Sequence, residues 1–286
     1  MNWVSVGQGA IGLLTACRLH TAGYPVTLLL RQPQTLTVCF KTAASAQTCQ
    51  FNAAQAPFNA VFVAVKAYAL KACLAQLQPA LTPDAQLVIS HNGMPDLDYL
   101  KQYVSEQQGI WFLSTSHAAL RTANAVEHTG QGQSMISPLN NAALQAQPVV
   151  MAAMQQALPP VTLTEDIKPA LWRKLAVNAA INPLSALLNC RNGELATAAL
   201  TPRITQLVNE VCQVAALENI ALDPKQTLEL VYKVITDTAQ NYSSMQQDKR
   251  FNRQLELDAI TGFILKTATK HRLAVPENQA LWQALQ

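Results

Sequence analysis

The 286-residue sequence predicts an α/β protein of two domains, a doubly wound parallel sheet followed by an all-helical domain. Three observations carry this prediction. The length suits about two domains at roughly 150 residues each. In the first half, short apolar runs alternate with helical patterns, which is typical of a parallel sheet with helices on both faces. After about residue 165 the strand-like runs stop and helical periodicity continues, so we place the domains at residues 1–165 and 166–286.

The chain begins with a strand–helix–strand unit. An apolar run at residues 3–6 stops at Gly7, a helical pattern continues to Gly23, and a second apolar run occupies residues 26–30. A helix is expected at residues 67–77. Further apolar, β-rich runs are expected to be strands: residues 61–65, 87–90 and 110–114. In the second half, four positions are expected to break the helical pattern: Pro183, Pro202, Asp223-Pro224 and Gly262.

The charge balance argues against a nucleic-acid partner. Twenty Lys and Arg against seventeen Asp and Glu give a formal net charge of +3, and no basic run exceeds two residues. Residues 1–83 nevertheless contain no Asp or Glu, and five basic residues: Arg18, Arg31, Lys41, Lys66 and Lys71. This bias favours a small anionic ligand, such as a phosphorylated molecule, in the first domain.

The six cysteines form no CxxC pair, and no Cys/His cluster has metal-ligand spacing, so no metal site is expected. Scattered cysteines in a chain of this size favour a reduced, cytoplasmic protein. The N-terminus lacks the basic region of a signal peptide, and prolines and amides interrupt the uncharged stretch 128–164. We therefore expect neither secretion nor a membrane partner.

The hexapeptide Gly7-Gln8-Gly9-Ala10-Ile11-Gly12 stands between a strand and a helix, the context in which a GxGxxG pattern binds a dinucleotide. Gly7 permits the tight turn, Gly9 lets the backbone approach a pyrophosphate, and Gly12 allows the helix to pack on the strand. Free N–H groups at the helix start would hold the phosphates. A plain structural turn is the alternative. The pattern predicts a dinucleotide site in the doubly wound sheet of the N-terminal domain.

Charged and polar residues follow the predicted strands. Arg31 stands where NAD-binding units place an Asp or Glu for the ribose hydroxyls, and an arginine there suits the 2′-phosphate of NADP(H). A solvated charge at a strand end is the alternative. Lys66 and Asn92 follow two further strands, and the carboxyl ends of parallel strands share one edge. We expect both to face the cofactor or a substrate carboxylate, although Asn92-Gly93 is also a common turn pair.

Three polar residues recur at helical spacing in the second domain. Lys174, Asn178 and Asn182 stand at i, i+4 and i+8 in an otherwise small or apolar run, so they share one helical face. Leaving such groups buried without partners costs on the order of 1–3 kcal/mol each, and a polar substrate would supply the partners. An exposed polar stripe is the alternative.

A carboxylate and two capping residues lie near the end of the chain. Glu256 shares an apolar helical stripe with Ile260 and Phe263, so its charge must be paired or hydrogen-bonded. Upstream, Ser243 and Gln246 have the spacing of a capping box, and a serine hydroxyl there can also contact a substrate. The five histidines show no ligand spacing, so we assign none of them to a metal or a catalytic triad.

These residues resemble the ketopantoate reductase (2-dehydropantoate 2-reductase) family over nearly the whole chain. The motifs that carry the resemblance are the glycine hexapeptide, Leu30-Arg31, Val65-Lys66-Ala67, His91-Asn92-Gly93-Met94, Ser116-His117-Ala118-Ala119, residues 171–184, Asn192-Gly193-Glu194-Leu195, Ser243-Ser244-Met245 and residues 256–262. One departure follows Met94, where Pro95 replaces the glycine of the family.

The resemblance implies a Rossmann domain, a helical domain similar to that of 6-phosphogluconate dehydrogenase, and an active site in the cleft between them. It also implies NADPH-dependent reduction of ketopantoate to pantoate, in pantothenate and coenzyme A biosynthesis, with Lys174 as general acid. The family's catalytic groups fall on Lys174 and Glu256. Its cofactor contacts fall on Gly7, Gln8, Gly9, Ala10, Ile11, Gly12, Arg31, Lys66, Asn92, Ala119 and Glu256. Its substrate contacts fall on Asn92, Lys174, Asn178, Asn182, Asn192 and Ser244.

Two other functions stay open at this point. A related NADPH-dependent 2-keto acid reductase would share this chemistry, because few residues contact the substrate tail. A non-catalytic NADPH-binding sensor would bind the cofactor without turnover, but it gives no reason for the Lys174 face beside Glu256. The sequence leaves open a monomer or a homodimer, and whether Glu256 contacts the substrate hydroxyl or the nicotinamide ribose.

Overall fold

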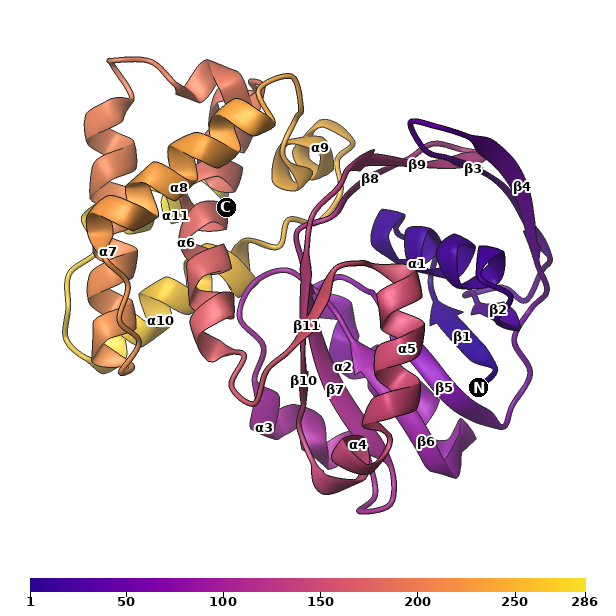
Figure 1. Ribbon diagram of the computed structural model, residues 1–286. Helices are drawn as coiled ribbons and strands as arrows, with labels where there is room; N and C mark the ends of the chain where they lie inside the picture. Colours follow the sequence, from indigo (N-terminus) through magenta and orange to yellow (C-terminus); the bar gives the residue numbers. More distant parts are fainter. The chain divides into compact units, whose positions relative to one another are not determined.

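The computed structural model describes residues 1–286, which divide into two compact units (Figure 1). Unit 1 comprises Met1–His91 and Asp96–Ile167, and unit 2 comprises Asn92–Pro95 and Lys168–Gln286. Unit 1 combines strands and helices, whereas unit 2 is helical, so the predicted fold class is confirmed. The short segment Asn92–Pro95 clusters with unit 2, although it lies inside the range that the sequence assigned to the first domain. None of the helices is both long and apolar enough to cross a membrane.

Unit 1 is built on a seven-stranded sheet with the order β11-β10-β7-β6-β5-β1-β2. Its strands are β1 Trp3–Val6, β2 Val26–Leu29, β5 Phe58–Val63, β6 Leu81–Ile89, β7 Gly109–Thr115, β10 Ser134–Pro138 and β11 Val161–Leu163. From β2 to β7 neighbouring strands are parallel, as expected, but β10 runs antiparallel to β7. Every strand that the sequence predicts is present.

Helices cover both faces of this sheet. The chain leaves β1 toward one edge through α1 (Ala10–Thr21) and leaves β5 toward the other edge through α2 (Leu70–Leu77). Right-handed crossovers in opposite directions place α1 and α2 on opposite faces. The helix expected at 67–77 begins as the 3₁₀ turn Ala67–Ala69, and the short helices α3 (Leu97–Leu100) and α4 (Asn141–Gln145) complete the connections.

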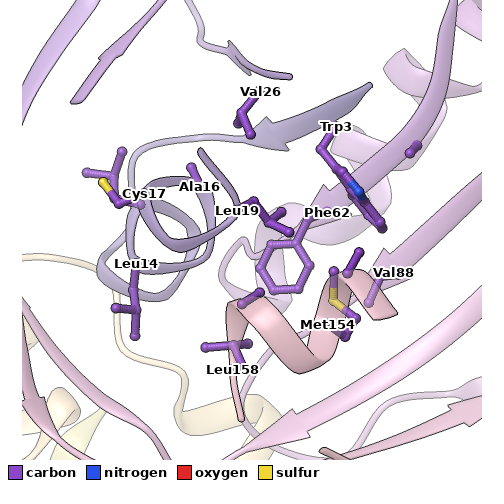
Figure 2. Packing of buried hydrophobic residues seen from close by; sticks show 14 of the residues in the cluster. Trp3, Leu14, Ala16, Cys17, Leu19, Val26, Phe62, Val88, Met154 and Leu158 are labelled. Carbon is purple, nitrogen blue, oxygen red and sulfur yellow. The ribbon is translucent and has the colours of Figure 1, made fainter. Parts of the chain in front are cut away.

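The main core of unit 1 lies between the sheet, α1 and α5 (Gln147–Ala157), which pack side by side. Figure 2 shows Phe62 of β5 surrounded by Leu19 of α1, Leu158 and Met154. Alternate strand residues point to opposite faces, so the apolar strands are buried on both sides. Each fully buried side chain of this size contributes about 1.5–3 kcal/mol relative to an exposed one.

A second, four-stranded sheet, absent from the sequence prediction, has the order β4-β3-β9-β8. Its strands are β3 Leu36–Lys41, β4 Ala46–Phe51, β8 Ala118–Arg121 and β9 Ala125–Gly130. It arches over α1 (Figure 1), and Val38, Phe51 and Val126 from it join the same core. Burial alternates along β3 and β4, where the buried residues Val38, Phe40, Cys49 and Phe51 stand between more exposed ones. β8 and β9 contain only short apolar stretches, so neither resembles the long apolar runs of the first sheet.

Unit 2 consists of helices packed around α6. The helices are α6 Lys168–Leu188, α7 Thr201–Leu217, α8 Pro224–Asp237, α9 Ser244–Arg250, α10 Phe263–Lys270 and α11 Pro276–Leu285. α6 packs against α7, α8, α9 and α11. Two expected breaks are confirmed as helix starts. Pro202 lies in the first turn of α7, and the Asp223 carboxylate caps α8 by accepting from the Gln226 N–H at 2.7 Å.

The other two expected breaks are wrong. α6 continues through the buried Pro183 to Leu188, because packing on its flanks outweighs the one backbone hydrogen bond that proline removes. Gly262 ends the π-helical turn Asp258–Gly262, which passes directly into α10. A Cβ added to Gly262 would lie 2.7 Å from a ring carbon of Trp282, so this glycine provides packing space and does not stop the helix.

Candidate active site

The glycine hexapeptide forms the turn between β1 and α1. Gly7 has φ +79°, a conformation that favours glycine. Gly9 is the exposed N-cap of α1, and no side chain caps this end, so the first N–H groups lack intrahelical acceptors. A Cβ on Gly9 or Gly12 would meet only ordinary contacts of 3.5 Å or more. An alanine would therefore fit at Gly12, although this buried position lies in contact with Ser5 and Ala64.

Two basic side chains lie at the same edge of the sheet as this turn. In-register pairing aligns the last residues of β1, β2, β5 and β6. The residues just beyond that row include Gly7, the exposed Arg31 and the partly buried Lys66. The structure thus brings the predicted cofactor residues of unit 1 to one edge, where doubly wound sheets bind ligands.

Ala119 reaches the same region from the second sheet. It lies on β8, is partly buried and packs against the core that contains α1. Sequence reasoning placed it by resemblance alone, because the strand that carries it was not recognised.

Lys174, Asn178 and Asn182 all lie in α6, and helical spacing puts them on one face. Asn182 is only 8% exposed, and the other two are partly buried. The exposed-stripe alternative is therefore wrong: this polar face lies against protein and needs hydrogen-bonding partners.

Burial lowers the pKa of Lys174 from its ordinary 10.5 to about 8, and the Glu256 carboxylate opposes this effect by raising it. Glu256 is itself only 5% exposed, so its charge acts in a largely desolvated environment. A lysine of this pKa is still mostly protonated at neutral pH and gives up its proton more readily than an ordinary one. Such a group suits proton donation to a substrate.

Glu256 precedes a helix and does not lie on one. The helix starts at Leu257 and continues as the π-helical turn Asp258–Gly262. The predicted i+4 and i+7 relations of Glu256 to Ile260 and Phe263 are therefore wrong, although the carboxylate is buried. Sequence spacing does not separate a π-turn from an α-helix, because both bury residues three to five apart.

The segment Asn92–Pro95 docks on this π-turn. The Met94 N–H donates to the Ala259 carbonyl at 3.1 Å. Gly93 has φ +81°, and an added Cβ would clash with the same Ala259 carbonyl. Both the backbone conformation and the contact with Ala259 therefore require glycine at position 93. This contact places the neighbouring Asn92 next to the π-turn that follows Glu256.

Asn192 starts the 3₁₀ turn Asn192–Leu195 and is 6% exposed. Its Nδ2 donates to Thr238 Oγ1 at 2.9 Å, whereas its buried Oδ1 has no partner. A buried acceptor without a donor costs about 1–3 kcal/mol. A ligand hydroxyl would relieve that cost.

Ser244 is the exposed first residue of α9. The preceding Ser243 accepts from the Gln246 N–H at 3.1 Å and is bonded to Ser185 of α6 at 2.7 Å. The predicted capping box is therefore only half formed, since the Gln246 side chain donates to Asn189 instead. These bonds fix α9 to α6 and leave the Ser244 hydroxyl for a ligand.

Comparison with known proteins decides the family. A family model described as "Ketopantoate reductase PanE/ApbA" matches residues 3–141, and its C-terminal counterpart matches residues 166–286. The 2-dehydropantoate 2-reductase of Vibrio cholerae serotype O1 is 39% identical over 289 residues, which cover 100% of this chain and 97% of that protein. The chain belongs to the ketopantoate reductase family.

Two solved structures share the fold of this ketopantoate reductase family member. A D-mandelate dehydrogenase in a ternary structure with NADH and anilino(oxo)acetate has a TM-score of 0.88 at 22% identity, over 99% of this chain and 96% of that chain. A dimeric ketopantoate reductase from Staphylococcus aureus has a TM-score of 0.82 at 24% identity, over 98% and 96%. Both likenesses support the Rossmann-type sheet followed by a helical domain.

Proposed function

We propose that this chain catalyses the NADPH-dependent reduction of ketopantoate to pantoate, with Lys174 as general acid. The reaction rests on the full-length likeness to a 2-dehydropantoate 2-reductase. The observation that carries the catalytic role is a lysine whose pKa burial lowers to about 8 beside the buried carboxylate of Glu256. A lone surface lysine would have neither property.

The glycine turn and its neighbours suit a dinucleotide. NADPH bound there would supply the hydride. The open N–H groups at the start of α1 hold the pyrophosphate, and Arg31 binds the 2′-phosphate in charge-assisted fashion. Lys66, Ala119 and the remaining residues of the turn complete the proposed contacts. The NADH of the D-mandelate dehydrogenase structure supports a nicotinamide cofactor, and Arg31 is the reason for preferring its phosphorylated form.

The residues of unit 2 hold and protonate the keto acid in this proposal. Negative charge develops on the carbonyl oxygen during reduction, and the Lys174 ammonium donates its proton there. Glu256 keeps that ammonium charged and orients either the substrate hydroxyl or the nicotinamide ribose. The substrate carboxylate and hydroxyl are positioned by hydrogen bonds with Asn92, Asn178, Asn182, Asn192 and Ser244, of which Asn192 accepts through its Oδ1.

The test follows NADPH oxidation by ultraviolet absorbance with ketopantoate, ketoisovalerate and oxaloacetate, and repeats the best substrate with NADH. We expect the highest kcat/KM for ketopantoate with NADPH. A higher value for another keto acid would instead identify a related reductase. Cofactor binding without turnover of any keto acid would identify a sensor, and equal use of NADH would contradict the role of Arg31.

A further inference from the structure

Arg121, a cation that lies outside the GxGxxG motif, contacts the glycine turn. Arg121 is the last residue of β8, and its Nη2 donates a hydrogen bond to Oε1 of Gln8 at 2.6 Å. Gln8 stands between Gly7 and Gly9, at the N-terminal end of α1. The Arg121 side chain is exposed and forms no ion pair, so a neutral amide oxygen is its acceptor.

The register of the second sheet explains why Arg121 reaches this turn. In the β8–β9 hairpin, Arg121 pairs with Val126 and Ala119 pairs with His128. Val126 is fully buried in the core that contains α1. Cross-strand partners and alternate residues share a face. Ala119 and Arg121 therefore both face α1, and the position of Arg121 at the strand end puts its guanidinium over the start of that helix.

The charges at this point favour an anion. The N-terminus of α1 has the positive end of the helix dipole, and its first turn contains no acidic residue and no side-chain cap. A guanidinium beside that end adds a like charge, and no Asp or Glu occurs in residues 1–83 to balance it. Gln8 holds the guanidinium without neutralising it. A phosphate group would be attracted by both, and the planar fork of arginine matches phosphate oxygens.

We propose that Arg121 is a further cofactor-binding residue, which contacts the pyrophosphate of the dinucleotide across the glycine turn. This inference rests on the proposed function, because it requires a dinucleotide at that turn. The pyrophosphate is common to NADPH and NADH, so Arg121 sets the affinity for both. Arg31, in contrast, acts on the 2′-phosphate and sets the preference between them. Gln8 keeps the Arg121 side chain in place before the cofactor binds, which reduces the ordering cost of binding.

The experiment measures the dissociation constants of NADPH and NADH by calorimetry for the wild type, Arg121→Gln and Arg31→Gln. We expect Arg121→Gln to weaken both cofactors by the same factor of roughly ten, about 1.4 kcal/mol. Arg31→Gln should weaken NADPH alone. The matched control is Lys41→Gln, which removes the same charge from an exposed position at the end of β3 in the same sheet and should change neither constant.

Arg121→Lys keeps the charge but not the fork, so its affinity should lie between those of the wild type and Arg121→Gln. Unchanged melting temperatures without cofactor would show that the variants are folded. Equal binding by wild type and Arg121→Gln would overturn the inference, and so would a loss confined to NADPH, which would put the guanidinium at the 2′-phosphate. A wild type that binds neither cofactor would instead overturn the proposed function itself.

Discussion

In its proposed role as general acid, Lys174 must be charged, yet burial favours its neutral form. Burial lowers its pKa to about 8, and the Glu256 carboxylate limits the decrease. The two effects together leave a lysine that is protonated at neutral pH and close to its transition. This balance belongs to the residue pair, because neither burial nor the carboxylate alone would produce it.

The rate of ketopantoate reduction should therefore fall as the pH rises through about 8, because the general acid loses its proton there. The measurement is kcat/KM against pH, which reports ionisations of the free enzyme. Glu256→Gln removes the influence that raises the pKa of Lys174, so in that variant the decline should begin at lower pH. A profile that stays flat well above pH 8, or a shift to higher pH in Glu256→Gln, would contradict this role.

Gly93→Ala should destabilise the protein more than Gly23→Ala. Both glycines have positive φ, +81° and +87°, so each alanine pays about 1–2 kcal/mol of backbone strain. The Cβ of an alanine at position 93 would also clash with the Ala259 carbonyl, whereas nothing lies within 4 Å of a Cβ on Gly23. Urea unfolding measures the difference in free energy. Because Gly93 holds Asn92, its variant alone should also lose kcat/KM, and equal losses in both would refute the docking role.

At the scale of elements, the second sheet is joined to α1 through a chain of hydrogen bonds. The Arg18 Nη2 of α1 donates to Nδ1 of His128 at 3.2 Å, and His128 Nε2 bonds His117 Nδ1 at 3.0 Å. His117 Nδ1 also accepts from the Gly132 N–H, so both imidazoles must be neutral for the chain to form. Burial is the main cause that lowers the pKa of each histidine, and Arg18 lowers both further.

This arrangement predicts acid-sensitive stability. Each histidine has a folded-state pKa below its unfolded value of about 6.5, so the unfolded chain binds protons first as the pH falls. The free energy of unfolding should thus decrease as the pH falls below about 6.5 and level off above it. Urea unfolding from pH 5 to pH 8 checks this, and His128→Gln should flatten the dependence. A variant that keeps the full wild-type slope would show that these histidines are not its source.

Sequence reasoning located the strand–helix–strand unit and the polar face of α6 because both depend on local pattern. The apolar run Trp3–Val6, the glycine turn and the spacing of Lys174, Asn178 and Asn182 are all visible within about twenty residues. The four-stranded sheet depends on pairing between segments far apart in the sequence, as where Cys39 pairs with Ala125, and no local apolar pattern indicates that pairing. Pro183 and Glu256 were misjudged because tertiary packing decided their conformation.

For the molecule as a whole, the candidate groups are divided between the two units, and Asn92 and Glu256 of unit 2 are candidates for contact with both cofactor and substrate. The glycine turn, Arg31, Lys66 and Ala119 belong to unit 1. The proposed substrate groups belong to unit 2. They include Asn92, whose short segment lies between two parts of unit 1 in the sequence but packs with the helices of unit 2. A dimer is described for the Staphylococcus aureus neighbour. For this chain, a monomer or homodimer and a cytoplasmic location stay predictions.

In the proposed function, NADPH binds mainly to unit 1 and Lys174 of unit 2 donates the proton, and the variant Lys174→Ala tests this separation. The measurement compares kcat with ketopantoate and the dissociation constant of NADPH in that variant, with Arg173→Ala, which alters the adjacent exposed cation of α6, as the matched control. We expect Lys174→Ala to lose about 10²–10⁴-fold in kcat while it binds NADPH like the wild type, and Arg173→Ala to keep both values. A Lys174→Ala enzyme with wild-type turnover would contradict the account.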